Sequence, residues 1–339
     1  MATAENAKVM VETGETLVPF EAMTDYNHQF FTSSEDVWSG WSGFNPSVMP
    51  NGLVNGGQVT PAAAGTADLV DVAAMIVNLA GVATSVQAAP NISVSRGVTS
   101  DICRITSITV TSAGAVVAVP GADNTVFSET RGANGGPPYI PVGDVEIAQV
   151  RVTSVSTGVI LQSEIKSDTN VHSERAFFPV IEEVNPIGQG TWAENAAAVN
   201  AYVKFNEALP LIHTGDKAKK VYIKTYAPSF TTLGRVSDFK PVQNAHSVSS
   251  QPIYGGAIGS SSTSIGQGGF TAFLDTGISD EILKVENKVV TIKFYPDKYR
   301  SGYSLTQGKI GIATTYPPGG QIQATVTISA ETITARFES

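Results

Sequence analysis

Residues 319–337 of the chain read GGQIQATVTISAETITARF. Apolar residues alternate here with uncharged polar residues, which predicts an extended strand with one oily side and one mildly polar side. The apolar set is Ile322, Ala324, Val326, Ile328 and Ala330, and the polar set is Gln323, Thr325, Thr327 and Ser329. Strand edges in solvent usually carry charged side chains that repel other strands, and this stretch has none before Glu331. We therefore expect another surface to cover its polar side.

The composition agrees with a β protein that associates with other chains. The 339 residues suffice for two ordinary domains or one large β domain, and 42% of them are hydrophobic, which is ample for a packed core. Only 15% are charged, against roughly a quarter in a typical domain. Glycine, serine, threonine, valine and alanine are abundant, and this mixture suits strands and turns joined in assemblies.

The net charge of −9 comes from the first half of the chain. Residues 1–170 hold 6 basic and 16 acidic residues, whereas residues 171–339 hold 15 and 14. An acidic surface argues against tight sequence-specific binding of nucleic acid, which requires lysine and arginine against phosphate. It is compatible with a surface that nucleic acid slides past, because like charges repel.

Cysteine usage and the N-terminus indicate a reduced, soluble environment. Cys103 is the only cysteine, so no intramolecular disulfide is possible, and we expect it to be a small buried core residue. The start MATAENAKVM lacks a cationic region followed by an apolar run, and no stretch approaches the roughly 18 apolar residues of a membrane span. These features predict a protein that is made and kept soluble in a cytoplasm, with no membrane partner.

The first sixty residues mix aromatic residues with turn formers and show no sustained period. This pattern predicts an irregular but ordered arm or loop. Its three aromatic residues Trp38, Trp41 and Phe44 give it apolar surface to bury.

Strand signals dominate between residues 102 and 166, after an ambiguous segment. Segment 67–81, ADLVDVAAMIVNLAG, is apolar on nearly every side and fits either a helix or a buried strand pair. Segment 102–121 holds two β-branched runs broken by Ser-Ala-Gly, which predicts a hairpin. In segment 143–155, GDVEIAQVRVTSV, the apolar alternation changes phase halfway, as a β-bulge produces. The intervening segment 128–144 is rich in glycine and proline, and we expect an ordered loop there.

The second half gives further strands and one ambiguous segment. Residues 191–210 open with Thr191 three residues before Glu194, the spacing of a helical capping box, yet later residues alternate as in a strand, so both structures stay open. Segment 255–269, GGAIGSSSTSIGQGG, has the composition of a flexible surface loop. Strands are expected in 221–226, 269–276, 288–297 and 308–315, with one or two helical turns in 278–286.

The sequence shows no constellation of catalytic or metal-binding residues. The four histidines stand far apart along the chain, and neither HExxH nor GxSxG occurs. They are His28, His172, His213 and His246. The glycine clusters lead into prolines or an apolar run rather than from a strand into a helix, which argues for loops and against phosphate sites. We therefore assign no catalytic, cofactor-binding or metal-binding residue, and expect no enzyme and no cofactor.

Three weaker patterns have ordinary structural explanations. Asp25 and His28 in DYNH are within reach of each other, but such a pair is more often a turn residue and a surface histidine than a metal site. Ser163 and Lys166 match the S-x-x-K spacing of serine acyl enzymes, but the companion SDN and KTG motifs are missing. The basic run in 216–220, DKAKK, is more typical of a solvated turn than of a nucleic-acid patch.

Segment 293–331, KFYPDKYRSGYSLTQGKIGIATTYPPGGQIQATVTISAE, resembles the C-terminal part of a bacteriophage major tail tube protein. The resemblance lies in an apolar strand ending in Phe-Tyr-Pro-Asp, a strand with Gly-Lys-Ile-Gly-Ile, and a Gly-Gly turn into a polar-alternating strand. Segment 128–154 is similar to tail components of virions. The likeness extends over most of residues 100–339, and its motifs are strands and turns of low specificity.

This resemblance implies a tail-tube-type β-sandwich or barrel-like subunit that closes with its copies into rings. Stacked rings would form a hollow tube in the virion tail, assembled in the host bacterial cytoplasm. The implied partners are further copies, other tail proteins at the tube ends, and the tape measure protein and DNA transiently in the lumen. Segments 26–60 and 255–269 would help rings to stack. A strand whose polar side faces the channel or a neighbouring subunit needs no lysine, because closure removes the free edge.

The corresponding domain division is an irregular arm (1–60), an N-terminal β domain (61–170) and a C-terminal tail-tube-like β domain (171–339). Each half has an alternating hairpin region followed by strands, although no fixed-period repeat aligns. If both β domains are tube domains, three chains make a ring of six domains, whereas one tube domain per chain requires a hexamer. The trimer is favoured because 339 residues is long for one tube domain.

A different class of protein also fits the sequence. A β-rich adhesin or receptor-binding protein of a phage or bacterium would use Trp38 and Trp41 to stack on sugars. Tryptophan in a loop is more often a buried anchor or an interface residue, which favours the tube interpretation. A hydrolase is disfavoured because no paired nucleophile and base appear.

Overall fold

The computed structural model describes the following parts of the chain: residues 4–33, 46–65, 67–96, 102–153, 158–177, 179–185, 201–215 and 217–337. These parts are mainly β, with several sheets. Their helices are short 3-10 segments: η1 (Ala4–Asn6), η3 (Gln162–Glu164) and η4 (Glu281–Val285). The prediction of a mainly β protein with at most short helices is confirmed. Among the described residues, no sheet closes into a barrel, and no helix combines the length and apolarity needed to cross a bilayer.

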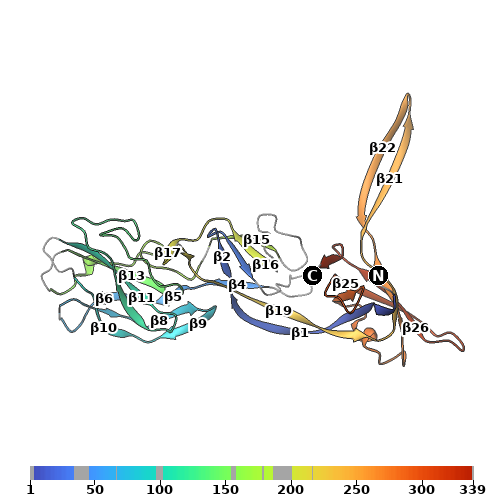
Figure 1. Cartoon of the computed structure of the whole chain (residues 1–339), viewed down its shortest axis with the longest axis horizontal. Coiled ribbons are helices and arrows are strands. Elements are labelled where there is room, and N and C mark those ends of the chain that lie inside the picture. Colours follow the sequence, from blue (N-terminus) through green and yellow to red (C-terminus); the bar gives the residue numbers. More distant parts are fainter. Residues whose placement is uncertain are drawn as a thin grey trace.

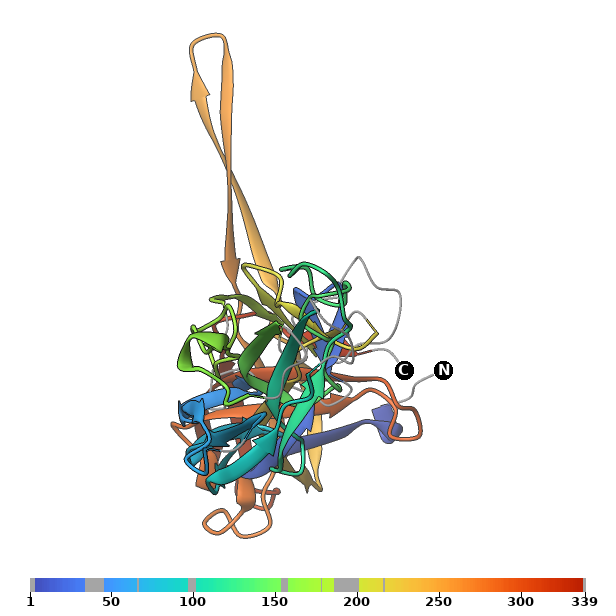
Figure 2. The ribbon, with the colours of Figure 1, turned by 90° about the vertical axis from the view of Figure 1, so that its left-hand side faces the viewer.

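The molecule is elongated, with a lobe at one end and a large sheet at the other (Figure 1). The first and the last strand of the described chain, β1 and β27, both belong to the large sheet, and a two-stranded hairpin stands away from the rest (Figures 1 and 2). Three hydrophobic cores follow one another: one in the lobe, one in the middle and one under the large sheet.

The C-terminal sheet contains nine antiparallel strands in the order β20-β23-β26-β25-β24-β1-β19-β4, with β27 paired to β25. Strand β26 alternates as predicted, because Ala324, Val326 and Ile328 are buried while their polar neighbours are exposed. The strands are β1 (Lys8–Ala22), β4 (Ser47–Pro50), β19 (Val221–Leu233), β20 (Val236–Lys240), β23 (Gly268–Phe273), β24 (Val289–Tyr295), β25 (Tyr303–Thr315), β26 (Gln323–Ser329) and β27 (Ala335–Phe337).

The distal lobe, at the other end, packs three small sheets around one core. Their orders are β12-β11-β13-β14, β5-β8-β9 and β10-β7-β6. The strands are β5 (Gly52–Gly56), β6 (Val59–Pro61), β7 (Leu69–Val72), β8 (Met75–Leu79), β9 (Val82–Val86), β10 (Ala89–Ser93), β11 (Cys103–Val110), β12 (Val116–Pro120), β13 (Val145–Thr153) and β14 (Ile165–Lys166).

Several local predictions hold in this lobe. The hairpin in 102–121 is confirmed as β11 and β12, and segment 67–81 forms strands β7 and β8 rather than a helix. The phase change in β13 is a β-bulge, because Ile108 pairs with Ala148 and the next residue pairs with Glu146. Cys103 differs from its prediction: it is half-buried at the start of β11 rather than in the core.

A middle region joins the lobe to the C-terminal sheet. It contains the sheet β15-β16-β3-β2 and the pair β17-β18, and the long strands β1 and β19 run from it into the C-terminal sheet (Figure 1). Its own strands are β2 (Thr24–Tyr26), β3 (Phe30–Ser33), β15 (Ile181–Asn185), β16 (Ala201–Phe205), β17 (Leu211–His213) and β18 (Lys217–Ala218). The ambiguous segment 191–210 is described only from residue 201 onward, and its residues Ala201–Phe205 form strand β16.

The prediction of an irregular arm over residues 1–60 is wrong for the described part. Strand β1 pairs with β19 and β24 inside the C-terminal sheet, and Phe31 is 1% exposed in the middle core. Strand β1 was not predicted because its apolar alternation is short: one side is apolar only near Val9 and Val11, and register shifts interrupt the pairing of the strand with β19. Trp38, Trp41 and Phe44 lie outside the described residues. The boundaries at residues 60 and 170, and the duplication of a tube domain, stay predictions.

Segment 255–269 is also not the expected loop. Most of it forms strand β22 (Gly256–Ile265), which pairs along its length with β21 (Asn244–Ile253). Cross-strand hydroxyl pairs join the two strands, with Oγ–Oγ distances of 2.6 Å for Ser247–Ser262 and 2.7 Å for Ser249–Ser260. A glycine- and serine-rich strand lacks the apolar period from which strands are predicted, so composition alone indicated a loop.

Candidate functional site

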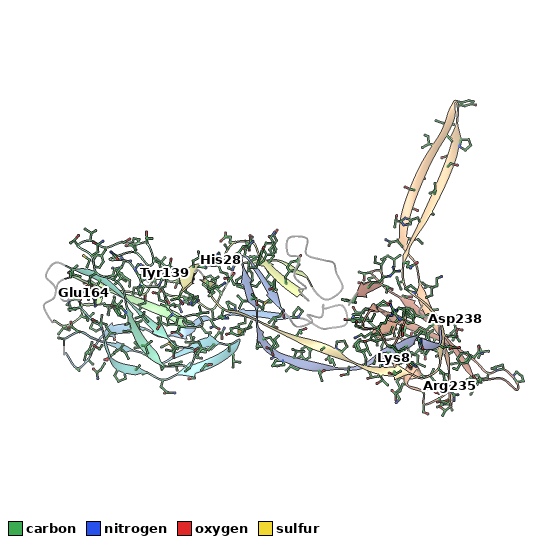
Figure 3. All side chains as sticks on the ribbon, in the orientation of Figure 1. Lys8, His28, Tyr139, Glu164, Arg235 and Asp238 are labelled. Carbon is green, nitrogen blue, oxygen red and sulfur yellow. The ribbon has the colours of Figure 1, made fainter. Side chains whose placement is uncertain are left out.

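The β21–β22 hairpin is the most exposed feature of the described structure. Every residue of both strands is exposed to solvent, and the hairpin points away from the body in both ribbon views (Figures 1 and 2). Tyr254 at its tip is fully exposed, and the Val248 side chain is 80% exposed. The side-chain view shows this isolation: few sticks surround the hairpin, whereas the lobe and the sheet are densely filled (Figure 3).

The hairpin carries no formal charge. Residues 241–274 contain no lysine, arginine, aspartate or glutamate, and its one histidine, His246, lies 3.0 Å from the hydroxyl of Thr263. Strands β21 and β22 form a sheet of their own, so each keeps one unpaired edge. An isolated two-stranded hairpin is at best marginally stable in water, and an uncharged open edge is a template for pairing with another chain. Both properties indicate a surface that becomes covered.

A second surface lies on the exposed face of β23, β26 and β25, and Lys309, opposite Ser329, is the one charged residue of these three strands. Directly paired residues of antiparallel strands share a face, which places Thr271, Thr325 and Ala313 in one row across the three strands. The next row is Gly269, Thr327 and Gly311. The glycines keep this face flat. It bears the polar side chains of β26, for which the sequence predicted a covering surface.

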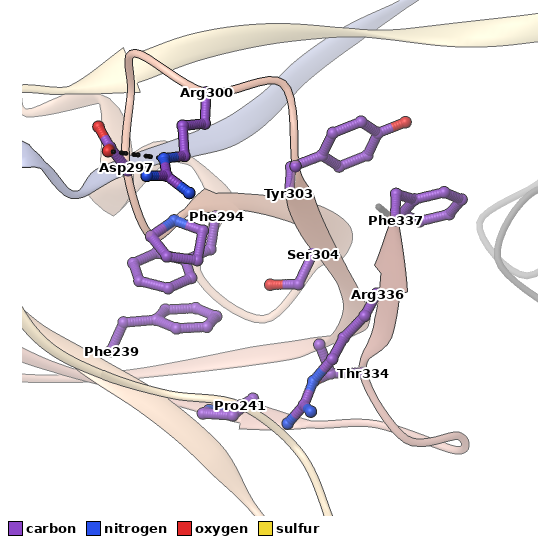
Figure 4. Close-up of a pocket in the computed structure, with 12 residues that line it drawn as sticks. Phe239, Pro241, Phe294, Asp297, Arg300, Tyr303, Ser304, Thr334, Arg336 and Phe337 are labelled. Carbon is purple, nitrogen blue, oxygen red and sulfur yellow. Dashed lines mark ion pairs between the residues drawn. The ribbon is translucent and has the colours of Figure 1, made fainter. Parts of the chain in front are cut away.

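An aromatic groove of about 670 Å³ opens beside the base of the hairpin. Phe239 stacks on Phe294 with ring centroids 4.2 Å apart, and Tyr303 stacks on Phe337 at 4.7 Å (Figure 4). The chain leaves this groove at Pro241 and enters β21 three residues later. The rings present apolar faces toward the groove, which therefore suits an apolar peptide segment better than a charged one.

The rim of this groove carries charge. Arg300 Nε lies 3.5 Å from Asp297 Oδ2, and the Arg336 side chain extends along the opposite wall (Figure 4). Lys293 Nζ lies 3.8 Å from the centroid of the Tyr303 ring, a cation–π contact that fixes the ring. These groups do not form the nucleophile, base and oxyanion arrangement of a hydrolytic site.

The four histidines do not come together. His28 lies in the middle region (Figure 3), and its Nδ1 is 3.2 Å from Asp25 Oδ2. Asp25 also accepts hydrogen bonds from the backbone N–H groups of His28 and Ala218, both at 2.9 Å, so it closes a turn. His213 is buried with Nδ1 at 3.1 Å from Pro141 O, and burial lowers its pKa to about 4. Within the described residues, no three His, Cys, Asp or Glu side chains are grouped as metal ligands.

The S-x-x-K pattern has no catalytic geometry in the described structure. Ser163 is exposed in η3, whereas Lys166 lies opposite Gln149 in the β14–β13 pair. The adhesin candidates Trp38 and Trp41, and the capping-box residues Thr191 and Glu194, lie outside the described residues.

The interpretation of 216–220 as a solvated turn is wrong for Lys219. Its side chain is 6% exposed, and Nζ lies 4.0 Å from Oε1 of the equally buried Glu174. Glu146 and Arg131 form a second ion pair beside it, and a small cavity adjoins all four side chains. No sequence motif marks this cluster, because its members come from four separate segments. The one local sign that Lys219 is buried lies in the apolar residues near it: Ala218 precedes it, and Val221 follows two residues later.

Comparisons of this chain with protein families, with curated proteins and with solved structures found no match.

Proposed function

We propose that this chain is a structural subunit that assembles with copies of itself, and that the assembly is the tube of a bacteriophage tail. The observation that carries the proposal is the bare, uncharged β21–β22 hairpin. A hairpin with all of its residues exposed lacks a core of its own, so its stability has to come from a surface outside the chain.

The length of the hairpin favours a neighbouring copy as that surface. Ten residues per strand at about 3.3 Å each give a reach of about 33 Å. The hairpin extends away from its own sheet (Figure 2), so its tip contacts a neighbour rather than its own body. A contact between one surface and a different surface of the next copy repeats without limit, as in stacked rings or a filament.

The exposed face of β23, β26 and β25, whose one charge is Lys309, provides a second area for burial in such an assembly. Rows of threonine, alanine and glycine on β23, β26 and β25 are flat and cost little to dehydrate compared with charged side chains. In a tube this face lies against a neighbouring subunit or lines the channel. A mildly polar channel wall with so few basic side chains would let DNA pass without retaining it. The trimeric ring is the favoured form, and a hexamer is its alternative.

Negative-stain electron microscopy and analytical ultracentrifugation of the purified chain test this proposal. We expect rings, stacked discs or tubes that grow with concentration. Changing Val248 and Ile258 on the hairpin to Lys places two charges on exposed positions and should shorten or abolish the tubes while the subunit stays folded. The matched control is Val126→Lys, at a loop position that is 62% exposed in the distal lobe. A wild-type chain that remains a monomer at every concentration contradicts the proposal, and discrete particles that bind glycan would support an adhesin instead.

A further inference from the structure

The distal lobe is fastened to the corner between β18 and β19 by a joint built around Lys219. Lys219 Nζ donates hydrogen bonds to the carbonyl oxygens of Arg175 at 2.9 Å and Phe177 at 3.3 Å. Arg175 belongs to the lobe, because it bridges to Leu53 in β5. The backbone of Lys219 therefore belongs to the β18–β19 corner, while its buried ammonium group donates to backbone carbonyl oxygens of the lobe.

One backbone hydrogen bond crosses the same boundary. The N–H of Asn51 donates to Lys220 O at 2.9 Å, while the Nδ2 of Asn51 donates to Gly143 O of the lobe at 2.9 Å. The N–H of Leu53 donates to Glu174 O at 2.9 Å within the lobe and so positions the segment that carries Glu174. Opening the joint breaks the bond between Asn51 and Lys220, which gives its opening a local measure.

The two buried carboxylates of the joint, Glu146 and Glu174, differ in the number of hydrogen-bond donors around them. Glu146 accepts hydrogen bonds from both terminal nitrogens of Arg131 and from the hydroxyl of Ser107, so its negative charge is well compensated. Glu174 receives only a long contact of 3.4 Å at Oε2 from the backbone N–H of Glu146. Its Oε1 has no hydrogen-bond partner, and the ammonium of Lys219 is 4.0 Å away.

The lack of hydrogen-bond donors around Glu174 determines its protonation. An ionised carboxylate without donors is strongly disfavoured in a buried site. Burial raises the pKa of Glu174 to about 8, and the nearby Lys219 opposes this rise only in part. A small cavity of about 50 Å³, whose lining includes Glu174, Ser173 and Asn170, has room for water, which gives the proton a route in and out.

We propose that this joint is a proton-controlled latch: Glu174 is protonated while the distal lobe is seated on Lys219, and loss of that proton favours opening of the joint. The latch lies within a single subunit and does not depend on the proposed assembly.

The direction of the pH effect follows from linkage. In an open joint Glu174 is solvated and has its ordinary pKa of 4.5. Between pH 4.5 and about 8, opening therefore releases a proton, and raising the pH favours the open state by up to about tenfold per pH unit. Below pH 4.5 both states hold the proton and this group adds no pH dependence. The closed state of the joint is therefore most stable in acid and becomes less stable as the pH rises toward 8.

Other titrating groups face the joint from neighbouring elements. Burial lowers the pKa of Lys219, and loss of its proton as pH rises favours closure, in the opposite sense to Glu174. His213 on β17 has a pKa of about 4 because of burial and is neutral from pH 5 to 8. Burial and Arg151 lower the pKa of His172, which acts in the opposite sense to Glu174 if it becomes solvated on opening. Arg131 and Glu146 form the remaining charged pair.

Hydrogen–deuterium exchange of the unassembled subunit, read at the amide of Asn51 between pH 5 and 8, tests the latch. After correction for intrinsic exchange rates, we expect the opening constant of this amide to rise with pH, while amides of β26 show no such rise. Glu174→Gln removes the titrating carboxyl group and should abolish the rise of the opening constant with pH. The matched control Glu286→Gln changes an exposed glutamate and should keep the wild-type slope.

A second variant provides an independent test in case the Glu174→Gln chain does not fold. Lys219→Met removes the cation that opposes the raised pKa of Glu174, so the range in which the opening constant rises should extend to higher pH. A flat wild-type profile overturns the proposal. So does a Glu174→Gln profile with the wild-type slope, or a Lys219→Met profile that is unshifted. Because the measurement uses single subunits, failure to assemble into tubes would not affect its outcome.

Discussion

Strands β22 and β26 use almost the same residues and have opposite surroundings. Both consist largely of serine, threonine, alanine, isoleucine and glycine or glutamine, and neither carries a charge. In β26 every second residue is apolar and buried, whereas β22 has a run of five Ser and Thr residues and is exposed on both faces. Alternation allows β26 to pack on a core within the chain. Strand β22 lacks this alternation, so any surface that covers it has to come from another molecule.

The largest expected effect is on the buried side of β26. Val326 is 1% exposed in the core of the C-terminal sheet, so Val326→Asp buries an unpaired charge and should cost more than about 3 kcal/mol. Val248→Asp on β21 places the same charge in solvent and should leave subunit stability nearly unchanged. Denaturant unfolding followed by circular dichroism compares the two. Equal losses would show that the hairpin is packed in the free subunit.

Glycine substitutions sharpen the comparison with a smaller change. A Cβ at Gly308 in β25 would lie 2.6 Å from Ser329 O and 2.9 Å from Ile328 Cγ2, so Gly308→Ala should cost about 1–3 kcal/mol. A Cβ at Gly259 in β22 meets nothing within 4 Å, and Gly259→Ala should change stability by no more than about 0.5 kcal/mol. Thermal melts of both variants measure this. A destabilising Gly259→Ala in the single subunit would contradict the description of β22 as bare.

A titrating group in the C-terminal sheet gives a smaller, pH-dependent effect. Burial raises the pKa of Glu12 in β1, although the Thr291 N–H donates to its Oε2 at 2.6 Å. A raised pKa in the folded state means that its stabilising contribution is present below pH 4.5 and is lost as pH rises through the folded-state pKa.

Glu12→Gln should therefore match the wild type near pH 4 and be more stable than the wild type near pH 7. Hydrogen exchange of amides in β24 and β25 measures the local stability, and the exposed Glu21→Gln is the control. A variant that is less stable than the wild type at pH 7 would show that the hydrogen bond from Thr291 outweighs burial.

Sequence reasoning was most successful where one face of a strand is buried. The alternation in 322–330, the hairpin in 102–121 and the bulge in β13 are each fixed by which residues must reach the core, and that requirement is visible locally. It was least successful in β1 and β22. The exposed part of β1 and the whole of β22 lack a buried face, so they carry no apolar period to detect.

The joint could not be predicted for a different reason. Arg131, Glu146, Glu174 and Lys219 are brought together by the packing of the lobe against the β18–β19 corner, and each alone resembles a surface charge. Of the candidate surfaces, the polar side of β26 was anticipated from its missing charges. The hairpin was anticipated only as a segment that reaches a neighbour, with its strand structure missed.

The smallest expected effect on the single subunit comes from removing the hairpin itself. Replacing residues 245–264 by a short Gly-Ser linker removes no residue of the three hydrophobic cores, so subunit stability should stay within about 0.5 kcal/mol of the wild type. The same deletion should abolish long assemblies, since it removes the contact proposed to join copies. In the intact chain, hairpin amides should exchange freely in the subunit and become protected in the assembly, because the open edges then have partners. A deletion variant that forms tubes of normal length, or a hairpin that is already protected in the single subunit, would place the self-association surface elsewhere, with the flat face of β23, β26 and β25 as the remaining candidate.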